Sequence, residues 1–193
     1  MHNLLQNYFW SYICLLVVAF AGCPQETISK LPDRLAAKSI DIEGTFTQKY
    51  DSKKVQIVVT KTDNKELPFQ LKCDDDEDLI RAQVYEVGKL KLLFMEGPGF
   101  TEENPAELTV NQFAVFKIAV TEKAVVLESL SNQYFNKNPS ALPGTKITRN
   151  KDDSVDITIS ATPEQLELFF RLHQDTPSLF YSEYPTVYNR VKK

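Results

Sequence analysis

The chain has 193 residues, of which 42% are hydrophobic and 25% charged, and its formal net charge is −4 at neutral pH. This hydrophobic content is sufficient for an ordinary globular core, which excludes disorder along the whole chain. The basic residues are scattered along the sequence and form no stripe, so nucleic acid is not an expected partner. The length beyond the N-terminal segment is typical of one domain.

The N-terminal segment, residues 1–22, contains no Asp, Glu, Lys or Arg, and its apolar core runs over residues 8–22. This length suits a secretory signal better than a membrane span of about 20 residues. The run ends in Phe20-Ala21-Gly22-Cys23, which resembles the lipid-attachment box of bacterial lipoproteins. The resemblance implies a signal peptide over 1–22, acyl chains such as palmitate on Cys23, and a membrane-anchored place in the bacterial cell envelope, on its periplasmic or surface face.

Two other interpretations of this segment stay open. Ala19-Phe20-Ala21 also fits a site for release by signal peptidase, and an uncleaved anchor starting near Leu4 is the third possibility. The cysteines connect these interpretations to the domain, since Cys14 leaves with a cleaved signal. Either Cys23 carries lipid and Cys73 is left alone, or Cys23 and Cys73 form a disulfide.

Residues 23–38 are predicted to form a tether or one short helical turn, because they combine two prolines with no sustained period. From Ser39 onward apolar and polar residues alternate, which is typical of half-buried strands. The alternation places Cys73 on the inward face of its strand. The predicted strands cover residues 39–47, 55–59, 69–73, 80–87, 89–96, 113–120, 124–130, 145–149 and 154–160, with long loops over 97–111 and 131–144.

A helix is predicted over residues 162–174. Thr162, Pro163 and Gln165 form a capping box with proline at the first helical position. The tail that follows is too aromatic to lie free in water, so we expect it to pack on the barrel or sheet. The aromatic residues of helix and tail either pack in the core, which helical spacing favours, or line the mouth of a ligand site: Phe169, Phe170, Phe180, Tyr181 and Tyr184.

The predicted fold is all-β: an antiparallel meander that closes into a small barrel or a strongly curved sheet, with one C-terminal capping helix. A single domain covers residues 39–193. Gly44-Thr45-Phe46 resembles the Gly-x-Trp motif near the first strand of lipocalin-like proteins, with Phe46 in place of tryptophan. Residues 39–190 also resemble uncharacterised exported bacterial proteins with a β-meander before a helix. Neither resemblance implies an activity.

The sequence contains no recognisable catalytic site and implies no cofactor. Alternate carboxylates at Asp74, Asp76 and Asp78 suggest a cation site, but Leu79 and Tyr85 stand where an EF-hand loop needs Gly and Glu, which favours a solvated turn. His173 is the only histidine outside the N-terminal segment, and its place at the end of the helix indicates a structural role. One histidine and so few cysteines do not supply the three or four ligands of a zinc site.

The sequence therefore predicts a non-enzymatic cell-envelope lipoprotein whose domain binds a small apolar ligand or another envelope component. The alternative is a structural or protein-interaction domain with a filled core. The two hypotheses differ in one structural feature, because a ligand barrel needs an interior cavity lined by apolar side chains.

Overall fold

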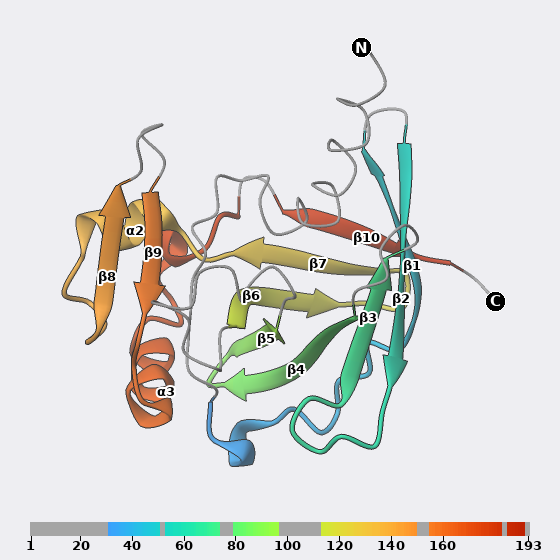
Figure 1. Ribbon diagram of the computed structural model, residues 1–193, viewed down its shortest axis with the longest axis horizontal. Helices are drawn as coiled ribbons and strands as arrows, with labels where there is room; N and C mark the ends of the chain where they lie inside the picture. Colours follow the sequence, from blue (N-terminus) through green and yellow to red (C-terminus); the bar gives the residue numbers. More distant parts are fainter. Residues whose placement is uncertain are drawn as a thin grey trace, which may run out of the picture.

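The computed structural model describes residues 31–50, 53–73, 79–96, 113–149, 155–182 and 185–191. Within these ranges the chain forms a β-barrel with a second layer of structure against one side (Figure 1). The strands are β1 Gly44–Tyr50, β2 Lys53–Lys61, β3 Phe69–Cys73, β4 Leu79–Val87, β5 Leu90–Glu96, β6 Phe113–Val120, β7 Ala124–Ser129, β8 Thr145–Arg149, β9 Val155–Ile159 and β10 Thr186–Arg190. The helices are α2 Asn132–Lys137 and α3 Pro163–Leu172, with short 3-10 helices η1 Asp33–Leu35 and η2 Pro177–Leu179.

Eight antiparallel strands close the barrel in the order β1-β10-β7-β6-β5-β4-β3-β2, which confirms the predicted all-β barrel. Closure depends on β10, since it pairs with β1 at Phe46↔Arg190 and with β7 at Tyr188↔Val125. This strand lies in the tail, which the sequence predicted only to pack on the barrel. A closed barrel leaves no sheet edge among these strands for another chain to pair with.

The β8–β9 hairpin does not join the barrel, although its strands were predicted as members of the same meander. Ile157 and Ile159 of β9 are fully buried, but they pack in a second core outside the barrel wall. The 131–144 connection is not the plain loop that was predicted, because it contains α2. Ser131 caps this helix by accepting a hydrogen bond from the Tyr134 N–H at 3.2 Å.

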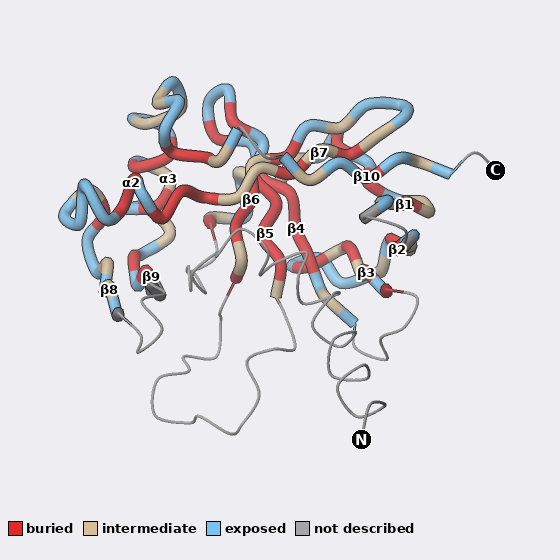
Figure 2. Tube along the Cα trace, turned by 90° about the horizontal axis from the view of Figure 1, so that it is seen from above, coloured by how far each residue is buried: buried red, intermediate tan, exposed pale blue. Residues whose placement is uncertain are grey.

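Two hydrophobic cores lie on opposite sides of the barrel wall. Along β5, Leu93 and Met95 point into the barrel, whereas Leu92 and Phe94 point outward into the second core. Figure 2 shows buried stretches side by side in the middle of β4, β5 and β6. Because both faces of β5 are covered, its sequence is a nearly continuous apolar run rather than an alternating one.

The second core, called here the flanking core, joins the outer wall of β4–β6 to α2, α3 and β9. Its largest fully buried members are Tyr85, Phe94, Phe135 and Phe170. The Tyr85 and Phe94 rings meet edge to face with centroids 5.1 Å apart. The flanking core makes α3 a layer fixed on the side of the barrel rather than a cap over its end.

Helix α3 begins and ends as its sequence predicts. The Gln165 N–H donates to the Thr162 hydroxyl at 3.3 Å, and the Thr162 N–H donates to Gln165 Oε1 at 2.8 Å, which completes the capping box. His173 is the C-terminal cap residue. Leu166, Phe169 and Phe170 face the flanking core, so the apolar stripe is buried as expected.

Part of the predicted tether belongs to the folded domain. Leu31 is 2% exposed and lies in the flanking core, and the Ala37 N–H donates to the Val84 carbonyl at 2.8 Å. Ile40 and Ile42 are buried in the barrel core, but the first strand begins at Gly44 rather than at Ser39. The segment of the predicted tether that the structure leaves undescribed is residues 23–30.

Glu167 connects η1 to α3. Its carboxylate accepts hydrogen bonds from Arg171 at 2.9 Å and from Arg34 at 2.5 Å. The hydrogen bond from Arg171, followed by that from Arg34, lowers the pKa of Glu167 below its ordinary value. A carboxyl whose pKa is lower in the folded state stabilises that state above its unfolded pKa, and the contribution is lost as the pH falls through the folded value.

We therefore expect Glu167→Gln to reduce stability at neutral pH and to flatten the loss of stability between about pH 5 and pH 3. Urea unfolding at a series of pH values measures this, with the exposed Glu164→Gln on the same helix as the control. An unchanged pH profile in Glu167→Gln would contradict the assignment.

Candidate functional site

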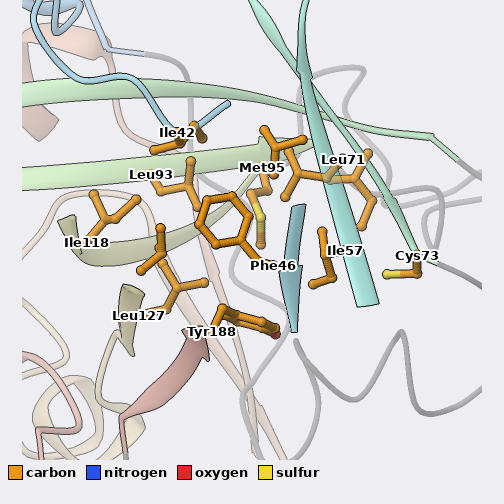
Figure 3. Close-up of a pocket in the computed structure, with 13 residues that line it drawn as sticks. Ile42, Phe46, Ile57, Leu71, Cys73, Leu93, Met95, Ile118, Leu127 and Tyr188 are labelled. Carbon is orange, nitrogen blue, oxygen red and sulfur yellow. The ribbon is translucent and has the colours of Figure 1, made fainter. Parts of the chain in front are cut away.

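A pocket lies inside the barrel, among side chains that point inward from its strands (Figure 3). It is lined by Ile42, Phe46, Ile57, Val59, Leu71, Cys73, Ile80, Leu93, Met95, Ile118, Val125, Leu127 and Tyr188. Apart from Ile42, which precedes β1, these residues come from β1 to β7 and β10. All eight barrel strands therefore contribute to one site.

Strand register sets the layers of this lining. Ile57 is paired with Phe46 on one side and with Cys73 on the other, while Ile118 is paired with Leu127 across β6 and β7. In an antiparallel sheet directly paired residues point to the same face, so each pairing places neighbouring side chains on the inner wall. The alternation of the strands thus generates the pocket without any special motif.

The pocket is small and chemically uniform. Its volume is about 50 Å³, and it is partly open to solvent. None of the lining residues is charged, and the side-chain heteroatoms are limited to the Cys73 and Met95 sulfurs and the Tyr188 hydroxyl. The placement of Cys73 confirms the predicted inward orientation, since it is 5% exposed. Such a lining favours apolar groups and excludes ions, which would lose their hydration without compensation.

The ring of Phe46 is covered by an arginine from the last strand of the barrel. The Arg190 guanidinium lies 4.8 Å from the centre of the Phe46 ring, and Arg190 Nη1 donates a hydrogen bond to the Glu43 carbonyl at 2.7 Å. Gly44 has φ of +144°, and a Cβ there would lie 2.9 Å from Arg190 Nη1. Local packing therefore explains why Gly44 precedes Phe46 by two residues, because the glycine makes room for the arginine that covers the phenylalanine ring.

The connections from β1 to β2, from β3 to β4 and from β5 to β6 include residues 51–52, 74–78 and 97–112, which lie outside the described residues. The predicted cation site at Asp74, Asp76 and Asp78 falls there, as Cys23 and Tyr184 fall in other undescribed segments. Among the residues that are described, no group of three or more His, Cys, Asp or Glu side chains is arranged to hold a metal ion. The described helices include none long and apolar enough to cross a membrane.

The helical aromatic residues belong to the flanking core rather than to the pocket, and the half-buried His173 packs against two of the core's aromatic rings. His173 Nδ1 lies 3.1 Å from the Tyr134 hydroxyl, and its ring centre lies 4.7 Å from that of Phe169. Burial raises the pKa of Tyr134. Phe169, Phe170 and Phe180 are all buried in the flanking core, which confirms core packing over a ligand mouth for these three.

The residues that line the pocket were not singled out from the sequence as a site. The available signal was their alternation, which identifies an inner face but does not distinguish a filled interior from a hollow one. Volume inside a barrel depends on how side chains from all the strands meet. This is information that no single strand carries.

Fold and site together define a closed eight-stranded antiparallel barrel with an apolar interior pocket. Comparisons with protein families, curated proteins and solved structures find no match to this chain.

Proposed function

We propose that this chain is a non-enzymatic, membrane-anchored protein of the bacterial cell envelope whose barrel binds a small apolar ligand. The pocket carries the binding part of the proposal, because it gathers 13 side chains without a charge around one space. The anchor rests on the sequence Phe20-Ala21-Gly22-Cys23, with acyl chains on Cys23. Each methylene buried in a bilayer contributes about 0.8 kcal/mol, so two or three chains hold a protein stably.

The dimensions of the pocket restrict the ligand. A cavity of about 150 Å³ lined by Leu, Ile and Phe accepts benzene, whereas this pocket measures about 50 Å³. A ligand therefore has to be narrow, such as the end of a single alkyl chain that enters from the open side. Its polar end would remain outside, since the lining offers no charged partner.

The small volume is also the observation that favours the second candidate function, a structural or protein-interaction domain with a filled core. Native mass spectrometry of the purified full-length protein distinguishes the two, because a bound apolar molecule appears as a discrete added mass. We expect such a mass, lost on extraction with organic solvent. The absence of any added mass, together with no binding of 1-decanol, would favour the filled core.

A pocket-filling variant provides the matched test. Val125 faces the pocket, and its neighbour Val126 faces outward on the same strand and is half-buried. We expect Val125→Phe to weaken binding of the single-chain alcohol 1-decanol, measured by titration calorimetry, about tenfold or more, whereas Val126→Phe leaves it unchanged.

Thermal unfolding of both variants is the control, because overpacking a core costs about 1–3 kcal/mol and must not be confused with unfolding. Equal affinity for 1-decanol in the folded Val125→Phe and Val126→Phe variants would place the alcohol outside the barrel and contradict the proposed site.

A further inference from the structure

Helix α3 has an exposed apolar face opposite the face that it buries. Leu168 and Leu172 are 57% and 71% exposed, and they lie one turn apart. The other large apolar side chains that are exposed among the described residues are Leu79, Val187 and Val191. Leu168 and Leu172 are the most exposed members of this set and adjoin on one helix. Together they form what we call the α3 leucine pair.

The first described residues of the chain, Leu31 to Leu35, lie beside this helix. Leu31 shares the flanking core with Leu166 and Phe170 of α3, and Arg34, three residues later, bonds to Glu167. Figure 1 shows η1 and α3 in the same corner of the molecule. A membrane anchor that precedes Leu31 is therefore attached to the domain on the side where α3 lies.

The length of the connection limits how the domain can turn. From Cys23 to Leu31 there are eight residue steps, which reach at most about 28 Å when fully extended. A folded domain of this size has a radius of gyration of about 15 Å and is therefore roughly 40 Å across. The tether is shorter than the domain, so an anchored molecule cannot turn the face around Leu31 to the side away from the bilayer.

The chemistry of the exposed face fits a lipid surface better than a second copy of the chain. Two leucines offer far less than the ~1,000 Å² that a stable dimer requires. A tethered domain needs only a weak contact, because the anchor keeps the local concentration of lipid high. The neighbouring charges on this face balance, with Arg34 and Arg171 against Glu164 and Glu167, so attraction to anionic lipid is not the driving force.

We infer that the α3 leucine pair inserts into the headgroup and acyl boundary of the membrane that holds the protein, and so fixes the orientation of the barrel. This inference rests on the anchorage in the proposed function. It adds a docking surface and an orientation, which do not depend on whether the pocket holds a ligand. Because the charges balance, zwitterionic lipid should suffice.

Site-directed fluorescence tests the contact on the full-length lipidated protein in phosphatidylcholine vesicles. Leu172→Cys is labelled with an environment-sensitive dye, and Val187→Cys on β10, away from α3 in Figure 1, is the matched control. The unsubstituted chain gives the background from the buried Cys73. We expect doxyl-labelled lipid to quench the dye at position 172 at least about twofold more than at position 187.

Flotation with the vesicles is measured in the same samples and separates the two claims. If the protein floats and both positions are quenched equally, or neither is, the docking surface is refuted while the anchorage stands. If emission at 172 shifts to the blue without quenching, the pair contacts a second copy of the chain instead of lipid. If the protein does not float, the anchorage fails and this inference fails with it.

Discussion

Truncation of the chain after Pro185 is expected to abolish the cooperative unfolding transition of the barrel. The deletion removes β10, which pairs with both β7 and β1, and it takes Tyr188 out of the barrel core. Two strands would then expose unpaired edges, and open edges promote association between chains. Near-ultraviolet circular dichroism and urea unfolding measure the loss, and size-exclusion chromatography measures the aggregation.

Deletion of only residues 192–193 is the control for the truncation, because it leaves β10 complete. This shorter deletion should unfold like the full chain. A cooperative transition of normal amplitude in the longer deletion would show that seven strands and the flanking core are sufficient, and would refute the role assigned to β10.

The substitution Phe170→Ala is expected to destabilise the protein by about 3–5 kcal/mol, the usual cost of removing a fully buried aromatic ring. Phe170 is 0% exposed and lies in the flanking core, where α3 meets the outer side of the barrel. The loss is large because the surrounding side chains come from several elements and cannot collapse together into the space. Urea unfolding followed by far-ultraviolet circular dichroism gives the free energy of unfolding.

Leu168→Ala on the same helix is the matched control, since Leu168 is 57% exposed and lies on the opposite face. We expect its effect to stay within about 0.5 kcal/mol, as for other surface substitutions. Similar losses for both variants would mean that α3 is held by its helical propensity rather than by the flanking core.

Local patterns along the chain predict most of the elements. The alternation of β3 and the capping box of α3 place both elements correctly, because each signal arises from neighbouring residues. Helix α2 could not be predicted from such patterns, since a segment of six residues is too short to show a helical period. The predicted start of the first strand at residue 39 is wrong. Ile40 and Ile42 show the alternation of a strand and are buried, but they do not pair in the sheet.

Membership of the barrel could not be predicted from the same patterns. Strand β9 alternates as well as any barrel strand, yet its buried residues belong to the flanking core. Strand β10 has a weak pattern in which Tyr188 is the one buried residue, and its role comes from pairing with residues 140 or more positions earlier. Alternation reports that a strand has an inner face, but not which core that face meets.

The pairing of Phe46 with Arg190 also governs the order in which the protein can fold. A chain that is released N-terminus first can form the hairpins between successive strands from β1 to β7 before the rest, because these hairpins need only local contacts. Closure waits for the last strand, which must find β1 across almost the entire length of the polypeptide. Contacts of such high sequence separation fold slowly. Until its C-terminal residues arrive, a chain of this topology is therefore an open sheet whose edge strands, β1 and β7, lack a partner.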